Sequence, residues 1–259
     1  MGKCIGTMQT TVQRVFQVFM MSHTIIALHY WAGSGHEFNV LRSLLPSHLR
    51  LLAPDLPGFG RQPVPVGFDF SVRAYADWVV AYLRQRQVDE FTLLGHSMGG
   101  KIALALAARQ PAGLQRLLLL APSPPTPEPM TETERAAALA AYGNPQAAAK
   151  TFDKITRLPL APSLQEQVIA DNLRCSHAAW DAWIQLGSRE NIDSLMPEIR
   201  VPCHLVVGTD DAAIKLATQY QQTLPRLPIG TPITLVPAAG HLLPLEAADI
   251  IADILNADS

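Results

Sequence analysis

One serine of this chain stands between glycines in a setting that is typical of an enzymatic nucleophile. Ser97 belongs to the run Gly-His-Ser-Met-Gly at 95–99, which follows the apolar run 91–94 and precedes an Ala-rich segment. An apolar strand, this glycine-flanked serine and a helix, in that order, predict a sharp turn that exposes the hydroxyl. The amino end of the helix would stabilise negative charge that develops on an attacked carbonyl. We therefore interpret Ser97 as a nucleophile rather than as part of an accidental turn.

A serine hydroxyl is a weak nucleophile until a general base accepts its proton. His241 is the best candidate, because it lies between the last apolar run, 233–236, and the last amphipathic segment, 245–255. His96 adjoins the serine, but neighbouring side chains diverge on such a turn, so packing is its expected role. His204 opens an apolar run. The remaining histidines lie in polar or cap-like contexts and are expected at the surface: His23, His36, His48 and His177.

A carboxylate is needed to hold such a histidine in the right tautomer and to stabilise its cation. Asp210 and Asp211 follow the apolar run 204–207, at a place between Ser97 and His241 in the chain. One of the two side chains can face the histidine while the other is solvated or caps the next helix. The two adjacent acids therefore leave the third catalytic residue open between these positions.

Short apolar runs alternate with longer segments of helical periodicity from Thr24 onward. The runs are 24–28, 49–53, 91–94, 117–121, 204–207 and 233–236. Helical spacing covers 37–45, 71–86, the segment from the serine to about Arg109, and 245–255. Apolar strands that alternate with amphipathic helices predict an α/β fold, in which helices cover both faces of a mostly parallel sheet.

The alternation is interrupted once, between about Pro122 and Arg200. The segment 122–129 is rich in proline and marks a boundary. Helical patterns follow around 131–141, 146–155, 163–172 and 177–187. We predict that residues 122–200 form an inserted helical cap over the carboxyl ends of the strands, where ligands bind in open α/β sheets. The core would then comprise 23–121 and 201–259, with 1–22 either an N-terminal extension or an edge strand.

Four motifs together resemble the α/β-hydrolase superfamily. They are Gly-His-Ser-Met-Gly-Gly at 95–100, Asp-Leu-Pro-Gly-Phe-Gly at 55–60, Gly-Thr-Asp-Asp at 208–211 and Gly-His at 240–241. The resemblance spans about Thr24 to Leu255 apart from the cap, and is closest to the branch of serine esterases, haloperoxidase-like enzymes and C–C hydrolases. It implies the α/β-hydrolase fold and a triad in the order nucleophile, acid, histidine. The usual Gly-x-x-Asp spacing of the superfamily favours Asp211 over Asp210.

The resemblance also implies an oxyanion hole made of two backbone N–H groups. One belongs to Met98, and the other comes from the loop after the first strand, where the aligned residue is Trp31. Relatives usually have His-Gly-x-x-Gly in this loop, whereas this chain has His-Tyr-Trp-Ala-Gly at 29–33, so that Tyr30 replaces a glycine. Any residue other than proline can supply a backbone donor.

Four side chains are candidates for the wall of a substrate pocket. They are His29, Tyr30, Trp180 and Trp183. The two cap tryptophans are three residues apart, so one helical face can present both. Ordinary packing is the alternative for the two cap tryptophans and for Tyr30 and Trp31. Lys101 follows the serine on the next helix and is expected to be solvated.

The leading hypothesis for function is hydrolysis of a small or medium, hydrophobic ester through an acyl-enzyme. Apolar residues such as Leu160 and Val168 in the cap favour such a substrate. C–C bond, thioester and lactone hydrolysis and perhydrolysis would use the same triad. A serine at the turn disfavours the relatives that attack with aspartate, such as epoxide hydrolases and haloalkane dehalogenases. The alternative of another class is a ligand sensor without turnover.

Composition excludes several other classes of function. The net charge of −2 offers no basic surface for nucleic acid or anionic lipid. No apolar run approaches the about 18 residues of a membrane span. Cys4, Cys175 and Cys203 show neither metal-ligand spacing nor a disulfide framework. We expect a cytoplasmic protein with a small-molecule substrate and no metal or cofactor; its oligomeric state is not determined by the sequence.

Overall fold

The computed structural model describes residues 23–257, and the predicted extension or edge strand at 1–22 lies outside them. A six-stranded sheet with the order β2-β1-β3-β4-β5-β6 forms the centre, and every neighbouring pair of strands is parallel. The strands are β1 (His23–Leu28), β2 (Leu49–Leu52), β3 (Phe91–His96), β4 (Leu114–Leu120), β5 (Cys203–Gly208) and β6 (Ile233–Val236). The predicted central sheet of mostly parallel strands is confirmed.

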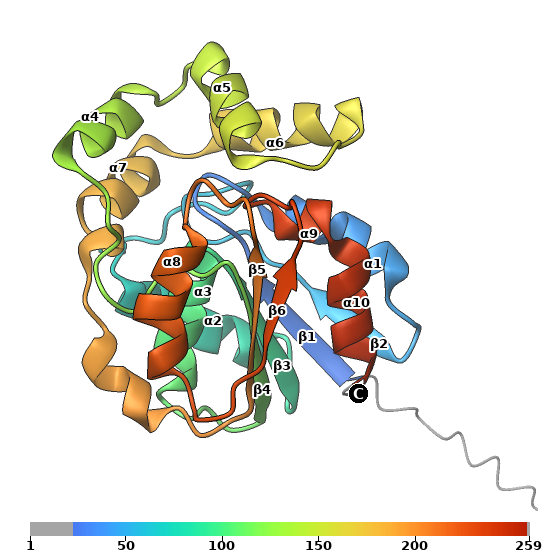
Figure 1. Ribbon diagram of the computed structural model, residues 1–259. Coiled ribbons are helices and arrows are strands. Elements are labelled where there is room, and N and C mark those ends of the chain that lie inside the picture. Colours follow the sequence, from blue (N-terminus) through green and yellow to red (C-terminus); the bar gives the residue numbers. More distant parts are fainter. Residues whose placement is uncertain (1–22, 258–259) are drawn as a thin grey trace, which may run out of the picture.

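Helices cover both faces of the sheet, because its central strands are apolar on both sides (Figure 1). Leu117 and Leu119 of β4 pack with α2 (Val72–Gln85) and α3 (Met98–Ala107). Leu118 and Leu120 face the opposite way, toward α1 (Asn39–Leu44) and α10 (Ala248–Ala257). The remaining core segments are η1 (Gly35–Phe38), α8 (Leu216–Thr218), η4 (Gln219–Thr223), η5 (Leu224–Arg226) and α9 (Leu243–Glu246).

Two predicted helices are interrupted in the structure. The segment predicted at 37–45 begins as the 3₁₀ helix η1 and continues as α1. The closing helix predicted at 245–255 is divided into α9 and α10, because Ala247 between them is not helical, with φ −145° and ψ 37°. The helix predicted at 71–86 is α2, and the Ser71 hydroxyl accepts a hydrogen bond from Ala74 N–H at its amino end.

Four helices lie between β4 and β5, above the carboxyl ends of the strands in Figure 1. They are α4 (Glu132–Ala140), α5 (Pro145–Ile155), α6 (Pro162–Arg174) and α7 (His177–Gln185), followed by η2 (Gly187–Arg189) and η3 (Asp193–Glu198). We keep the name cap for residues 122–200. Polar contacts tie the cap to the core: Glu246 accepts hydrogen bonds from Arg157 N–H and Leu158 N–H, at 2.5 and 2.7 Å.

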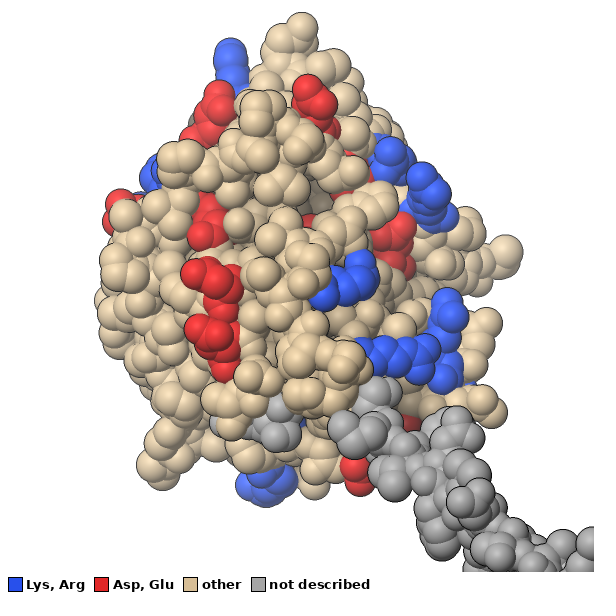
Figure 2. Space-filling view, turned by 90° about the vertical axis from the view of Figure 1, so that its right-hand side faces the viewer, with Lys and Arg blue, Asp and Glu red and all other residues tan. Residues whose placement is uncertain are grey.

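The surface next to α1 and α10 is mostly uncharged. Figure 2 shows acidic and basic side chains on this face in separate small groups, with no continuous field of one sign. Among residues 23–257, no helix has the length and apolar character needed to cross a membrane.

Candidate active site

Ser97 occupies the sharp turn between β3 and α3, as the sequence predicts. Its φ of 52° and ψ of −114° are strained for a residue with a side chain. The turn also requires small neighbours: a Cβ on Gly95 would lie 2.6 Å from the carbonyl oxygen of Gly99, and a Cβ on Gly99 would lie 2.2 Å from that of Leu28. The strained backbone of Ser97 therefore places its hydroxyl at the amino end of α3.

The structure brings three distant side chains into one hydrogen-bonded line. Ser97 Oγ lies 2.9 Å from His241 Nε2, and His241 Nδ1 lies 2.7 Å from Asp211 Oδ2. A carboxylate only accepts, so Nδ1 carries the proton and Nε2 is free to accept the serine proton. The other oxygen of Asp211 accepts hydrogen bonds from the backbone N–H groups of Ala213 and Ile214. The acid is thereby held in one orientation toward the histidine.

Asp210 does not reach this line. Its side chain is exposed and its Oδ1 accepts a hydrogen bond from Thr209, whereas Asp211 is 5% exposed. Asp210 N–H is fixed by the carbonyl of Ala239 at 3.0 Å, and the two successive side chains diverge from that point. Of the two adjacent acids, the tertiary contacts therefore bring only Asp211 to His241.

The environment of His241 favours its protonated form. Burial lowers the pKa of this imidazole, but the charge and hydrogen bond of Asp211 oppose that effect. The charge of Glu128 adds to the rise, and the net pKa lies above the usual 6.5 of histidine. An imidazolium that forms during proton transfer from Ser97 would therefore be stabilised where it arises.

The sequence predicts that two backbone N–H groups, those of Trp31 and Met98, form an oxyanion hole. Within the described chain, the N–H groups of Trp31 and Met98 donate to no other backbone group outside regular helix or strand pairing. Tyr30, which stands where relatives have glycine, does not adopt a positive φ, and the left-handed residue of this loop is Ala32 with φ 62°. The loop is stabilised at the Tyr30 carbonyl, which accepts hydrogen bonds from Gly33 N–H and from His29 Nδ1.

A cavity of about 390 Å³ opens beside Ser97 and His241, between the core and the cap. Trp31 and Trp180 stand against each other in its wall, with ring centroids 4.2 Å apart. The other aromatic and large apolar lining residues are Tyr30, Met130, Phe152, Ile155, Trp183, Ile184 and Ile214. Its volume and lining match those of pockets for small organic ligands.

His29, predicted to line the pocket, does not reach it. The side chain is fully buried, and its ring nitrogens are used by the Tyr30 carbonyl and by Leu56 N–H, which donates to Nε2 at 2.9 Å. A histidine with both nitrogens engaged inside the core fixes the loop that carries Trp31. The expectation for this residue is therefore corrected from pocket wall to loop support.

Lys101 is fully buried, contrary to the expectation of a solvated side chain. It lies on α3, all of whose residues are buried, and its ammonium group donates to the carbonyl of Thr126 at 3.1 Å. Burial lowers the pKa of Lys101 to about 8, while the charges of Glu128 and Glu190 work against that fall. The apolar character of α3 on every side was the available signal, because it indicates a fully enclosed helix.

Glu128 is a residue of the cavity wall that sequence reasoning missed. It is 9% exposed, and burial raises the pKa of its carboxyl. Two hydrogen bonds fix the backbone of Glu128. Its N–H donates to the carbonyl of Ser188 at 2.8 Å, and its carbonyl accepts a hydrogen bond from the Arg135 side chain. Its place in a proline-rich segment gave no helical or strand pattern from which burial could be predicted.

Metal-binding side chains do not gather in the described residues. Between His23 and Ala257, no group of three or more His, Cys, Asp or Glu residues is placed to hold a metal ion. The chemistry available at the site is that of a serine, a histidine and a carboxylate beside an apolar cavity.

Known proteins share this architecture. Residues 25–254 match the model of the alpha/beta hydrolase family. A pimeloyl-[acyl-carrier protein] methyl ester esterase of Neisseria meningitidis is 31% identical over 199 residues, or 73% of this chain and 75% of that protein. The enzyme of the same name from Aeromonas salmonicida is 35% identical over 117 residues, or 45% of this chain and only 43% of that protein.

A solved structure agrees with the sequence comparisons at the level of the fold. The esterase from Exiguobacterium antarcticum superposes with a TM-score of 0.83 at 19% sequence identity, over 91% of each chain.

Proposed function

We propose that this chain, which belongs to the alpha/beta hydrolase family, cleaves small or medium hydrophobic esters through an acyl-enzyme on Ser97, as the esterase names of its relatives suggest. The observation that carries this proposal is the line from Ser97 through His241 to Asp211, which opens on the 390 Å³ cavity. The alcohol group of the substrate is proposed to be small, as in the methyl esters named for the relatives.

In the first half of the reaction, Ser97 Oγ attacks the ester carbonyl carbon while its proton passes to His241 Nε2. The N–H groups of Trp31 and Met98 donate to the resulting oxyanion. Asp211 stabilises the imidazolium through Nδ1–H. The C–O bond to the alcohol then breaks, and His241 returns the proton to the leaving oxygen, which leaves an ester between Ser97 and the acyl group.

In the second half, His241 takes a proton from a water molecule as that water attacks the acyl carbonyl. The same two N–H groups bind the second oxyanion. Ser97 leaves with the proton held by His241, and the carboxylic acid is released. The apolar wall around Trp31 and Trp180 would exclude further water from the acyl chain and orient the carbonyl toward Ser97.

A panel of esters tests this proposal. We expect kcat/KM for p-nitrophenyl esters to rise from acetate to a medium-length acyl chain and then to fall, and methyl esters of the same acids to be hydrolysed. Ser97→Ala should abolish turnover and labelling by a fluorophosphonate. Wild-type protein that neither hydrolyses any of these esters nor reacts with the fluorophosphonate would refute an ester hydrolase.

The shape of the cavity offers a matched test of specificity. Trp183→Ala enlarges the cavity at the cap, so the preferred acyl chain should become longer, while labelling of Ser97 is retained. A C–C cleavage substrate and a lactone belong in the same panel. Turnover confined to one of those substrates would replace the ester by that bond type on the same three residues.

A further inference from the structure

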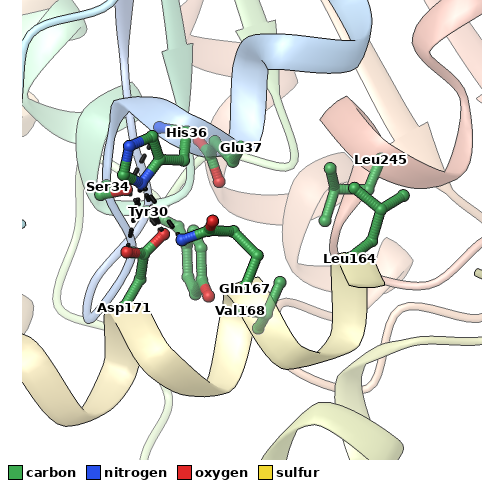
Figure 3. A pocket seen from close by; sticks show the side chains of 10 residues that line it. Tyr30, Ser34, His36, Glu37, Leu164, Gln167, Val168, Asp171 and Leu245 are labelled. Carbon is green, nitrogen blue, oxygen red and sulfur yellow. Dashed lines mark hydrogen bonds and ion pairs between the residues drawn. The ribbon is translucent and has the colours of Figure 1, made fainter. Parts of the chain in front are cut away.

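Two consecutive residues of η1 connect the cap to the interior of the core. His36 faces α6, where its Nδ1 lies 3.3 Å from each oxygen of Asp171 (Figure 3). Ser34, just before η1, donates to the same carboxylate at 2.7 Å. Asp171 is 3% exposed, so these bonds form a buried contact between cap and core. The next residue, Glu37, reaches His96 of β3 and also lines the small cavity between η1 and α6 that Figure 3 shows.

Glu37 contacts His96, the residue before the nucleophile. Both side chains are buried, and His96 Nδ1 lies 3.2 and 3.1 Å from the two carboxyl oxygens of Glu37. The opposite ring nitrogen, Nε2, lies 2.8 Å from the carbonyl oxygen of His241. A carbonyl can only accept, so Nε2 carries the proton, and the ring of His96 is fixed in one orientation.

These contacts hold the backbone of His241 from two directions. The carbonyl of His241 accepts from His96, which belongs to the core, and the N–H of His241 donates to the carbonyl of Ile155 at 2.7 Å, at the end of α5 in the cap. The rings of His96 and His241 also pack together, with centroids 5.0 Å apart. With both backbone groups engaged, the position of Nε2 relative to Ser97 depends on these supports.

The buried pair between Glu37 and His96 is held neutral. Burial raises the pKa of Glu37 well above its usual value, against the charges of His29 and His241 and with that of Asp171. Burial also lowers the pKa of His96 to about 3, and the charge of His241 adds to that effect. The Glu37 hydroxyl therefore donates to Nδ1 of His96. The remaining ionisable groups that act on the pair are Asp211 and Glu246, which act on His96.

A neutral support suits the reaction better than an ion pair. During proton transfer, His241 becomes a cation 5.0 Å from the His96 ring, and a second cation there would oppose it. The Glu37–His96 bond supplies orientation without that opposing charge.

We propose that Glu37 and His96 are positioning residues for His241. Through η1, the contact between α6 and the core would also influence the position of the catalytic histidine. This inference rests on the proposed role of His241 as general base. Neither Glu37 nor His96 lines the 390 Å³ cavity or is hydrogen-bonded to Ser97 Oγ. Of the cavity-lining residues that the His96 ring contacts, Tyr30 is packed against it without a hydrogen bond, whereas His241 is both packed against it and hydrogen-bonded to it.

The double variant Glu37→Met/His96→Phe tests the inference. It removes both buried polar partners together, which preserves folding better than removal of one, but it leaves the His241 carbonyl unsupported. We expect kcat per fluorophosphonate-titrated site to fall by about tenfold to a hundredfold, with KM within about twofold of wild type. Wild-type kcat per titrated site in this variant would overturn the inference.

Two further variants separate positioning from charge and from the proposed function. Glu37→Gln keeps a donor toward His96 and should retain kcat within about threefold; a loss equal to that of the double variant would contradict the neutral hydrogen bond. His36→Ala should lower kcat in the same direction but less, and unchanged kcat would refute the part assigned to the cap contact. If Ser97→Ala or His241→Ala remained active, the proposed function itself would fail, whatever Glu37 does.

Discussion

Nδ1 of His241 lies 2.7 Å from Oδ2 of Asp211, and no such contact exists for the adjacent Asp210 among the described residues. The pairing fixes which histidine nitrogen carries the proton, and so makes Nε2 the acceptor that faces Ser97. Asp210 and Asp211 are therefore adjacent in the chain, but Asp211 lies in the site and Asp210 lies at the surface.

That relationship predicts opposite outcomes for two neighbouring substitutions. Asp211→Asn should lower kcat by about a thousandfold to ten-thousandfold, because an amide at this position favours the wrong tautomer of the histidine. Asp210→Asn should leave kcat within about twofold, since surface substitutions of this kind are nearly neutral. Steady-state kinetics on one ester decides the matter, and equal losses in both variants would show that neither acid acts alone.

The pH dependence of kcat/KM should follow the raised pKa of His241. Activity requires neutral Nε2, so kcat/KM should fall as the pH drops through a midpoint above 6.5. Glu128→Gln removes one negative charge that raises this pKa, and the midpoint should move downward by about a few tenths of a pH unit.

Glu132→Gln is the control for this shift, because Glu132, the first residue of α4, is an exposed acid near Glu128 in the chain that does not line the cavity. A midpoint that stays in place in Glu128→Gln, or moves equally in both variants, would contradict the assigned effect of Glu128 on His241.

Removal of one oxyanion donor should reduce turnover without loss of the fold. Trp31→Pro deletes the backbone N–H and is expected to lower kcat by about a hundredfold to a thousandfold. Trp31→Ala keeps the N–H and alters only the cavity wall, so its main effect should be on KM for long acyl chains. Equal kcat values for the two variants would place the second donor elsewhere in the loop.

The buried Lys101 should make the stability of the protein depend on alkaline pH. Its pKa of about 8 lies below the ordinary 10.5, so between these values the unfolded chain binds the proton that the folded chain has released. Wild-type stability should therefore rise with pH over this window, by up to about 3 kcal/mol.

Lys101→Met should abolish this dependence. It should also be more stable than wild type at pH 7, because the folded protein no longer has to bury a charged ammonium group. Urea unfolding at pH 7 and pH 10 measures both effects. Lys150→Met, on the exposed side of α5, is the matched control and should keep the wild-type slope. A wild-type slope in Lys101→Met would show that another group titrates.

Local patterns determined much of the fold. The apolar runs that predicted strands correspond to β1 through β6, and the glycines around Ser97 predicted the strained turn, because only small residues fit where β3 meets α3. The divisions at η1–α1 and α9–α10 were missed, because apolar periodicity continues across each of these breaks and does not register a local change of backbone conformation, such as that at Ala247.

The sequence by itself determined the candidate nucleophile and base, since the order of strand, turn and helix is a local property around Ser97 and His241. Only the tertiary structure shows that Asp211, which the spacing of the superfamily favours, contacts His241, and that Lys101 is buried. It also places His29 away from the cavity and Glu37 against His96. Each of these depends on contacts between residues far apart in the chain, such as the 144 positions between Ser97 and His241, and burial in such contacts is what sets orientation and charge.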